Sequence, residues 1–428
     1  MKSIKSALII ISFFATLVSH AQVADSIYSP NIHSVRFHMY GDQQSMPVYN
    51  LNSSDQLELH FDDLSGNYKN YYYAYQLCDY DWQPNEILNP FDYVKGFTQM
   101  RITNYRYSSI AYTKYTHYQI VLPENNSIPN RSGNYLLKVF LDGDPSKLVF
   151  TRRLLVLDQK ASIAGKIIQP FTPQLFNTHQ KLVFTADIKG LNAFSAGQQV
   201  KAVILQNNRW DNALRDIPPT FIRGNSLEYN TENNSIFPGG KEWRWLDLRS
   251  FRLLSDRVKS GEYKKSTATI EVLPDVDRSA QKYIYFRDLN GMYNIETYES
   301  INPYWQGEYA DVYFSLVPPG NQPYANRNIY LFGQLTDYKI NDSTKMIFNA
   351  AKGIYEGHAL LKQGYYNYEY YATDAAGVPQ PDVLEGNYWE TENAYTILIY
   401  YKGFTDRSDQ LIGIAKITSR TDRPGFSF

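Results

Sequence analysis

The sequence predicts an all-β protein made of tandem β-sandwiches. Twenty-four glycines and 20 prolines separate short apolar or aromatic segments, which recur about every ten residues. Long stretches with the 3.6-residue periodicity of an amphipathic helix are scarce. Short strands at this spacing, separated by turn residues, are typical of immunoglobulin-like sandwiches. We therefore expect tandem immunoglobulin-like β-sandwiches along the chain.

The first predicted unit covers residues 22–158. In residues 57–61 apolar and polar side chains alternate, which indicates a half-buried strand. A tyrosine-rich strand follows at 71–77. Two later strands, 135–141 and 152–157, flank the sequence DGDP, whose residue types favour a hairpin turn.

The second predicted unit covers residues 159–303. Apolar segments at 163–168, 182–188 and 200–205 predict its first strands. Residues 241–259 contain neither glycine nor proline, and their apolar positions fit the strand and helix periods poorly. We interpret that segment as strands joined by a bend.

The third predicted unit covers residues 304–417, with strands at 312–316 and 329–333 and a hairpin around Gly364. The residues after Ile417, 418–428, are predicted to be a mobile tail.

Landmarks in the third unit follow a characteristic order. A strand ends at Gly333, Asp337-Tyr338 follows, and the glycine-led segments 353–356 and 364–374 come next. This order resembles that of starch- and glycogen-binding immunoglobulin-like modules. The resemblance implies a sugar-stacking face, although Tyr338 stands where those modules carry a tryptophan.

The N-terminus has the pattern of a secretory signal peptide. Lys2 and Lys5 precede the apolar run 7–18, and small residues lead to Ala21. The run is shorter than the roughly 20 residues that cross a bilayer, so we predict cleavage after Ala21 rather than a membrane anchor. No cysteine follows the run directly, which argues against a lipid anchor.

Charge and cysteine content argue against nucleic-acid binding and against a disulfide-stabilised fold. Removing the signal peptide leaves 40 basic and 43 acidic side chains, a net charge of −3, which offers little attraction for nucleic acids. Cys78 is the only cysteine, so intramolecular disulfides are excluded. Because no nearby histidine would activate its thiol, we predict a buried, inert side chain.

The sequence shows no constellation typical of catalysis or metal binding. Six histidines remain in the mature chain, and no two of them have the i, i+2 or i, i+4 spacing of a local metal site. Two aspartate pairs, Asp62/Asp63 and Asp79/Asp81, follow strands and are better explained as turn caps. We predict no catalytic residue, no metal and no cofactor.

Tyrosine is unusually abundant, with 38 copies, and it clusters at 71–75 and 365–371. Tyrosines at consecutive strand positions point to both faces of a strand. About half of these rings are expected in the core, and the others suit protein recognition or sugar stacking.

Several motifs resemble one protein family. HFDDL, YQLCDYDW and DYVKGF lie between His60 and Phe97, and SGNY, RR, QNNRWDN, DLNG, LKQGYYNY and TEN follow in order. Together they are similar to the plug proteins of the type IX secretion system, over nearly the whole mature chain. The resemblance implies a periplasmic, non-enzymatic protein that occludes a large outer-membrane β-barrel translocon until cargo or a shuttle protein engages.

Each of the two possible functions has its own set of candidate site residues. The sequence does not predict the oligomeric state. The candidate translocon contacts are Asp79, Asp81, Trp82, Phe97, Asn207, Arg209 and Trp210. The alternative function is a non-catalytic glycan-binding protein of the periplasm or cell surface. Its candidate stacking residues are Tyr338, Tyr366, Tyr368 and Trp389.

Overall fold

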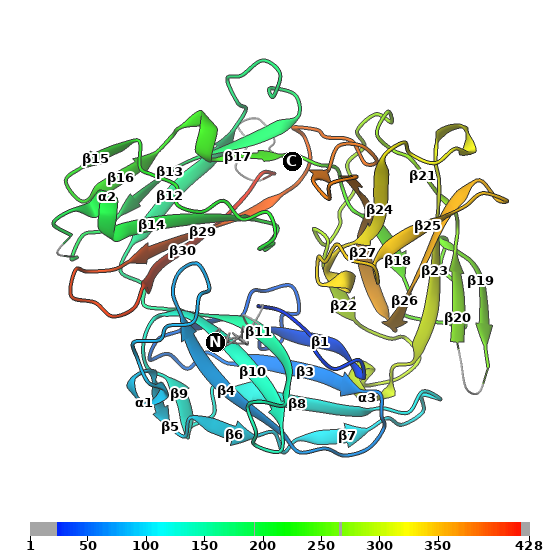
Figure 1. Cartoon of the computed structure of the whole chain (residues 1–428), viewed down its shortest axis with the longest axis horizontal. Coiled ribbons are helices and arrows are strands. Elements are labelled where there is room, and N and C mark those ends of the chain that lie inside the picture. The colour runs from blue at the N-terminus through cyan, green and yellow to red at the C-terminus, as the bar shows by residue number, and fades with distance from the viewer. Residues whose placement is uncertain (1–23, 192, 265–267, 421–428) are drawn as a thin grey trace, which may run out of the picture.

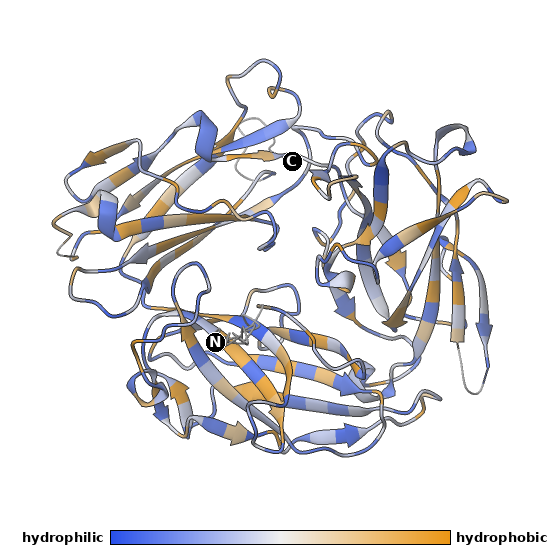
Figure 2. Ribbon diagram, in the orientation of Figure 1, coloured by the Kyte–Doolittle hydropathy of each residue, from blue (hydrophilic) through white to orange (hydrophobic). Residues whose placement is uncertain are grey.

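The computed structural model describes residues 24–191, 193–264 and 268–420. The predicted signal peptide, 1–21, and most of the predicted mobile tail lie outside the described residues. The protein is mostly β and forms three lobes, each with its own hydrophobic core (Figure 1). Figure 2 shows hydrophobic and hydrophilic residues alternating along the strands of all three lobes. Within the described ranges, no helix has the length and apolar character needed to cross a bilayer.

The first lobe, residues 24–158, is a sandwich of two sheets. One sheet has the order β1 (Ile32–Met39), β3 (Leu57–Asp63), β8 (Thr116–Leu122) and β7 (Tyr105–Tyr107). The other contains β11 (Leu148–Leu157), β10 (Gly133–Leu141), β4 (Tyr71–Cys78) and β6 (Gln99–Arg101), with β2 (Val48–Asn50) paired to β11. At one end lie α1 (Pro90–Tyr93), β5 (Val94–Gly96) and β9 (Ser127–Pro129).

Local sequence explains several features of this lobe. Leu57, Leu59 and Phe61 are buried between the two sheets, as their alternation predicts. The DGDP sequence turns the chain between β10 and β11, where Asp142 and Gly143 have φ values of 56° and 71°, the left-handed values that such turns favour. Cys78 is buried, and burial raises its pKa to about 12, as expected for an inert thiol.

The second lobe is discontinuous in sequence, with residues 159–240 and 389–420. Its outer sheet contains β12 (Ser162–Ile168), β13 (His179–Asp187), β16 (Ser226–Tyr229), β15 (Phe221–Arg223) and β17 (Ile236–Pro238). Its inner sheet contains β14 (Val200–Gln206), β29 (Ala394–Tyr401) and β30 (Gln410–Thr418). Two short helical turns, α2 (Ala196–Gln199) and η1 (Glu232–Asn234), complete it.

The inner sheet continues into the first lobe. Strand β30 pairs with β11 in parallel through Leu157 and Leu411, so one hydrogen-bonded sheet crosses the boundary between the two lobes. Every residue of β29 is buried, because its two faces pack against different cores. Ile397 and Ile399 belong to the second-lobe core, whereas Leu398 contributes to a cluster that includes first-lobe residues.

The third lobe, residues 241–388, is built on a long, curved sheet. Its main path is β18 (Arg244–Asp247), β27 (Gly364–Asp374), β24 (Arg327–Phe332), β25 (Lys345–Asn349), β26 (Ile354–Lys362), β23 (Tyr309–Val317), β20 (Ala268–Val272) and β19 (Val258–Tyr263). The side strands are β21 (Asp275–Val276), β22 (Tyr293–Ile295) and β28 (Pro379–Gln380). Short helices are α3 (Pro303–Gln306), η2 (Pro319–Asn321) and η3 (Gln334–Thr336).

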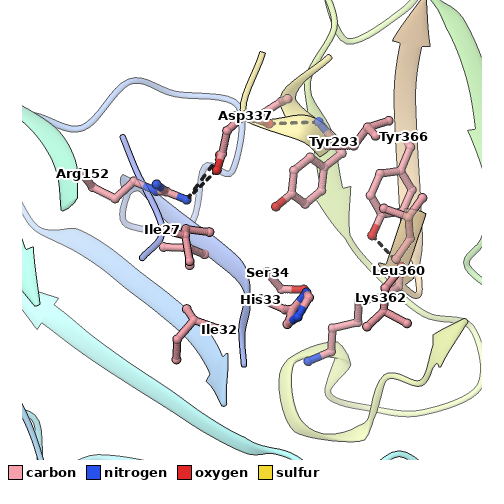
Figure 3. Close-up of a pocket in the computed structure, with 14 residues that line it drawn as sticks. Ile27, Ile32, His33, Ser34, Arg152, Tyr293, Asp337, Leu360, Lys362 and Tyr366 are labelled. Carbon is pink, nitrogen blue, oxygen red and sulfur yellow. Dashed lines mark hydrogen bonds and ion pairs between the residues drawn. The ribbon is translucent and has the colours of Figure 1, made fainter. Parts of the chain in front are cut away.

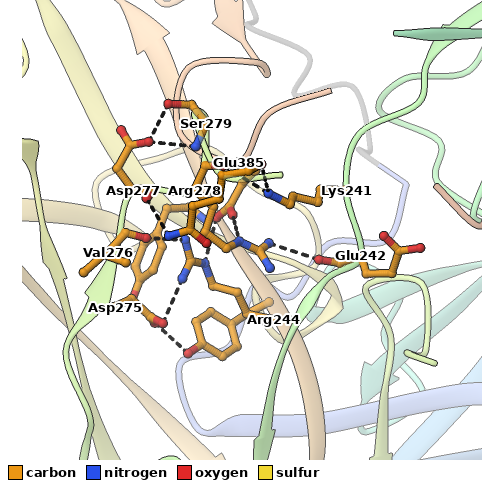
Figure 4. Close-up of polar contacts among 12 residues, drawn as sticks. Lys241, Glu242, Arg244, Asp275, Val276, Asp277, Arg278, Ser279 and Glu385 are labelled. Carbon is orange, nitrogen blue, oxygen red and sulfur yellow. Dashed lines mark hydrogen bonds and ion pairs between the residues drawn. The ribbon is translucent and has the colours of Figure 1, made fainter. Parts of the chain in front are cut away.

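A buried ionic network holds this lobe together (Figure 4). The Arg244 guanidinium lies 2.8 Å from Asp275 and 2.9 Å from Glu385, and Arg278 lies 2.6 Å from the other oxygen of Glu385. Burial alone would raise the pKa of Glu385, but the two arginines hold it at about 2. The network ties β18 and β21 to the segment that leads back to the second lobe.

The sheets do not follow the predicted boundary between residues 303 and 304. Strands β18 to β22, predicted in the second unit, lie in the third-lobe sheet, whereas β29 and β30, predicted in the third unit, complete the second lobe. The reason is physical: strand pairing between distant segments depends on the packed structure and leaves no local sequence pattern.

Candidate functional site

The loop after β4 contains three of the predicted contact residues. Asp79 accepts a hydrogen bond from the Asn85 side chain at 3.0 Å, and Asp81 accepts one from the backbone N–H of Gln83 at 3.2 Å. These bonds hold a tight turn in which Trp82 has a φ of 71° and is only 6% exposed. The two carboxylates therefore act in this structure as turn caps, and Trp82 points inward.

Trp82 meets Trp210 at the boundary between the first and second lobes. The two rings form an edge-to-face pair with centroids 4.9 Å apart. The Arg153 guanidinium lies 4.9 Å from the Trp82 ring centroid and 5.0 Å from that of Trp210, and it also pairs with Asp25. A cation against two tryptophans is a favourable contact, so these residues fasten one lobe to the other.

Asn207 and Arg209 occupy the loop that follows β14. The Asn207 side chain bonds to Asn393 at 2.8 Å and to the backbone N–H of Ala394 at 2.9 Å. Arg209 pairs with Asp211 at 2.7 Å and lies over the rings of Phe332 and Tyr338 from the third lobe.

Two cavities lie where the lobes meet. The larger, about 320 Å³, has walls from all three lobes, including Arg153, Trp210 and Tyr338. The smaller, about 110 Å³, lies between the first and third lobes, where Arg152 reaches Asp337 at 3.3 Å (Figure 3). The Arg152–Asp337 pair joins two lobes at these cavities, whereas Arg153 pairs with Asp25 within the first lobe.

A buried ionic cluster between the first and third lobes is absent from the sequence prediction. Asp62 on β3 lies 2.5 Å from the Lys362 ammonium, and it accepts hydrogen bonds from Tyr309 at 2.5 Å and from His117 at 2.6 Å. Burial would raise the pKa of Asp62, but Lys362 and His117 lower it. Burial lowers the pKa of His117 to about 4. Little in the sequence signals this cluster, because Asp62 continues the polar face of β3 after Glu58 and His60, as the polar residues of a half-exposed strand would.

Exposed apolar side chains gather in a short stretch of the first lobe. Ile87, Phe91 and Phe97 are 63%, 77% and 63% exposed. We call residues 87–97 the 87–97 surface. Among the predicted contact residues, Phe97 is a large apolar side chain that remains available to a partner, whereas Trp82 is packed inside.

The predicted glycan-stacking set is wrong as a platform. Tyr366 and Tyr368 are 2% and 0% exposed, and their hydroxyls donate to the carbonyl of Lys362 and to Asp275. They lie two positions apart on β27, so both side chains point to the same, buried face of the sheet. Tyr338 is half-buried against Phe332, and Trp389 packs against the second-lobe core. The four rings therefore do not share an open face.

Comparison with known proteins agrees with the motif resemblance. Residues 32–158 match the family model described as the type 9 secretion system plug protein 1st domain. Residues 32–158 belong to the type 9 secretion system plug protein first-domain family. The predicted resemblance is thereby confirmed, and the match ends at the last residue of the first predicted unit.

A solved structure resembles this protein over nearly its full length. It is a hypothetical protein from Parabacteroides merdae, 29% identical, with a TM-score of 0.88 over 93% of this chain and 99% of that one. Two α2-macroglobulins, from E. coli and Salmonella, align at 9% and 8% identity, covering 92% and 93% of this chain and 23% and 24% of theirs. Their TM-scores of 0.18 and 0.17 are too low to indicate a shared fold. No curated protein matches the sequence.

The family match covers several features of the first lobe. The turn that carries Trp82, the 87–97 surface, and Asp62 with His117 all lie within residues 32–158, whereas Lys362, the partner of Asp62, does not. Arg209 and Trp210 lie outside it, where they pack against the other lobes.

Proposed function

We propose that the protein is a soluble periplasmic plug that occludes the periplasmic opening of the type IX secretion translocon until cargo or a shuttle protein engages. The observation that carries this proposal is the match of residues 32–158 to the plug protein first domain. The signal peptide predicted from the sequence supports export to the periplasm.

The contacts between the lobes support a plug in which the three lobes are held in fixed positions. A continuous sheet joins the first lobe to the second, and the Asp62–Lys362 pair joins the first to the third. Arg209 joins the second to the third through Phe332. A pore wide enough for folded cargo is sealed only by a body that does not deform into it.

The 87–97 surface is our candidate for contact with the pore wall. Its three exposed apolar side chains alternate with charged and polar neighbours such as Asp92 and Lys95. A contact that must release needs a modest, mixed surface rather than a large apolar one. A net charge of −3 for the mature chain adds no strong general repulsion or attraction.

Site-specific photocrosslinking tests this proposal. A photoreactive benzoylphenylalanine replaces Phe97 in the full chain, expressed in cells that secrete by this route. The matched control places it at Phe221, an equally exposed phenylalanine (57%) on the second lobe. We expect a crosslink to a very large outer-membrane barrel from position 97 and little from position 221.

Two outcomes would count against the proposal. Equal crosslinking from both positions would remove the 87–97 surface from the contact. Failure to recover any outer-membrane barrel, both by crosslinking and by affinity purification from gently solubilised membranes, would overturn the plug function.

A further inference from the structure

Three metal-ligating side chains come together on the outer face of the first-lobe sheet. His38 on β1 stands directly opposite Glu58 on β3, and His60 follows Glu58 on the same face, two positions along the strand. One ligand atom from each residue lies within 4.8 Å of the others. His38 lies 20 residues before Glu58 in the sequence, and it is the register of β1 against β3 that brings the two side chains together.

Hydrogen bonds fix which nitrogen of His60 carries a proton. The Asp62 carboxylate accepts only, so Nδ1 of His117 donates to it at 2.6 Å. In the neutral His117 ring Nε2 is then an acceptor, and Nδ1 of His60 donates to it at 3.2 Å. The lone pair of His60 consequently lies on Nε2, which is 3.5 Å from a Glu58 oxygen.

His38 has the same arrangement. Its Nδ1 donates to the carbonyl of Met39 at 2.9 Å, which leaves the lone pair on Nε2. Both histidines are buried, at 1% and 5% exposure, and Nε2 of each has no good hydrogen-bond partner in the described part of the chain. A backbone or side-chain acceptor on Nδ1, with Nε2 free, is the usual state of a metal-binding histidine.

We infer that His38, Glu58 and His60 form a binding site for a divalent transition-metal ion, with Zn²⁺ as the best fit. Nε2 of His60 and a carboxylate oxygen of Glu58 are acceptors that already face each other, and the same oxygen accepts a long bond of 3.4 Å from the backbone N–H of Gly41. With Nε2 of His38 added, two imidazole nitrogens and a carboxylate oxygen make a ligand set that zinc prefers. Zinc bonds of about 2.0–2.2 Å place neighbouring ligand atoms about 3.3 Å apart. His60 and Glu58 already have nearly this separation.

Binding requires the buried His38 ring to turn. Nδ1 of His38 lies 4.0 Å from Glu58, so directing Nε2 at the ion gives up the present bond from Nδ1 to the carbonyl of Met39. Glu58 is 18% exposed, which provides a route of entry and leaves room for water as a fourth ligand.

The site lies under the third lobe. The ring of Tyr304, in α3, stacks on His60 with centroids 4.0 Å apart and planes 6° from parallel. The His117–Asp62 pair that supports His60 ends on Lys362 of the third lobe. A bound ion would therefore strengthen the contact between the first and third lobes, in a structural role that stands independently of the plug function.

Zinc titration of the chelator-stripped mature protein tests the inference. We expect one equivalent of Zn²⁺ to bind, and Glu58→Gln to weaken binding on the order of tenfold or more. His358→Ala is the matched control, because His358 is exposed on β26 and remote from the cluster in sequence and strand. That variant should bind like the wild type.

Two measurements on the wild type avoid any effect of substitution on folding. Histidine side-chain ¹⁵N spectra should show Zn²⁺ shifting Nε2 of His38 and His60 while His358 is unchanged, and hydrogen exchange of α3 should slow when Zn²⁺ is added. The inference is overturned if the stripped protein binds no zinc, if Glu58→Gln binds as tightly as the wild type, or if other histidines shift instead.

Discussion

At the residue scale, several polar and charged side chains are buried inside the protein. Glu242 is an example, buried at 1% exposure in the segment that enters the third lobe. It accepts hydrogen bonds from the Tyr283 hydroxyl at 2.5 Å and from the backbone N–H of Glu392 at 3.2 Å. Burial raises its pKa from 4.5 to about 7, against the lowering effect of these bonds.

This raised pKa predicts that the stability of the fold decreases as the pH rises. A carboxyl group whose pKa is higher in the folded state stabilises the fold fully below pH 4.5, and that contribution is lost as the pH rises through 7. Glu242→Gln should remove the loss, so the variant should be more stable than the wild type at pH 8 by up to about 3 kcal/mol and similar to it near pH 4.5. Urea unfolding at several pH values measures the difference.

The exposed Glu262 provides the control, because it pairs with the neighbouring Lys264 at the surface. Glu262→Gln should change stability equally little at every pH. A Glu242→Gln difference that stays constant between pH 4.5 and 8 would contradict the assignment.

The sequence could predict some residue environments and not others. The alternation of Leu57 to Phe61 identified a buried face, and the isolation of Cys78 identified an inert thiol. Tyr366 and Tyr368 were misjudged because a two-residue period shows that they share a face but does not show whether another layer covers it. Trp82 was misjudged because its partner, Trp210, lies far along the chain.

At the element scale, the buried ion pairs determine how strands of the third lobe are held. Arg244→Met should destabilise the protein by about 3–5 kcal/mol, because Asp275 and Glu385 would be left buried with less compensation. Chemical denaturation measures this loss. Lys352→Met, at an exposed pair with Glu356, should leave the unfolding midpoint nearly unchanged. A small effect at Arg244 would show that water replaces the guanidinium.

The hairpin of β29 and β30 makes a second prediction at this scale. Ile397 is fully buried in the second-lobe core, so Ile397→Ala should cost about 2–5 kcal/mol. Hydrogen exchange should show the loss of protection in β13 and β14 rather than in β23 or β27. Ile347→Ala, at a 64% exposed position of the third lobe, is the control. Loss of protection centred on β27 would contradict the lobe assignment.

Strands were easier to predict than their partners. The segments at 182–188, 200–205 and 312–316 became β13, β14 and β23, because local alternation and turn residues identify strands. The return of β29 to β14 was not predictable, since pairing across nearly 200 residues depends on which apolar faces remain uncovered after the third lobe has formed.

At the scale of the whole molecule, the Asp62–Lys362 pair links the first and third lobes. Lys362→Met should destabilise the protein by about 3–5 kcal/mol, because Asp62 loses its buried countercharge. Hydrogen exchange should accelerate in α3, β8 and β26, while β13 keeps its protection. Lys259→Met, at an exposed pair with Glu271, is the control. Uniform acceleration across all three lobes would show that the lobes unfold as one unit.

Because the second lobe is discontinuous in sequence, it can be completed only after the third lobe has been synthesised. A chain that emerges from the N-terminus has all the strands of the first sandwich once residue 157 is free, and those of the third lobe by residue 380. The inner sheet of the second lobe must wait for residues 394–418, near the very end. Until then β14 lacks its partner strand β29 and is open to wrong partners, and the end of β11 at Leu157 lacks its contact with β30. The β29–β30 hairpin therefore completes the second lobe only after the third lobe has been synthesised, and a nascent chain that stalls before it would be a target for quality-control proteases.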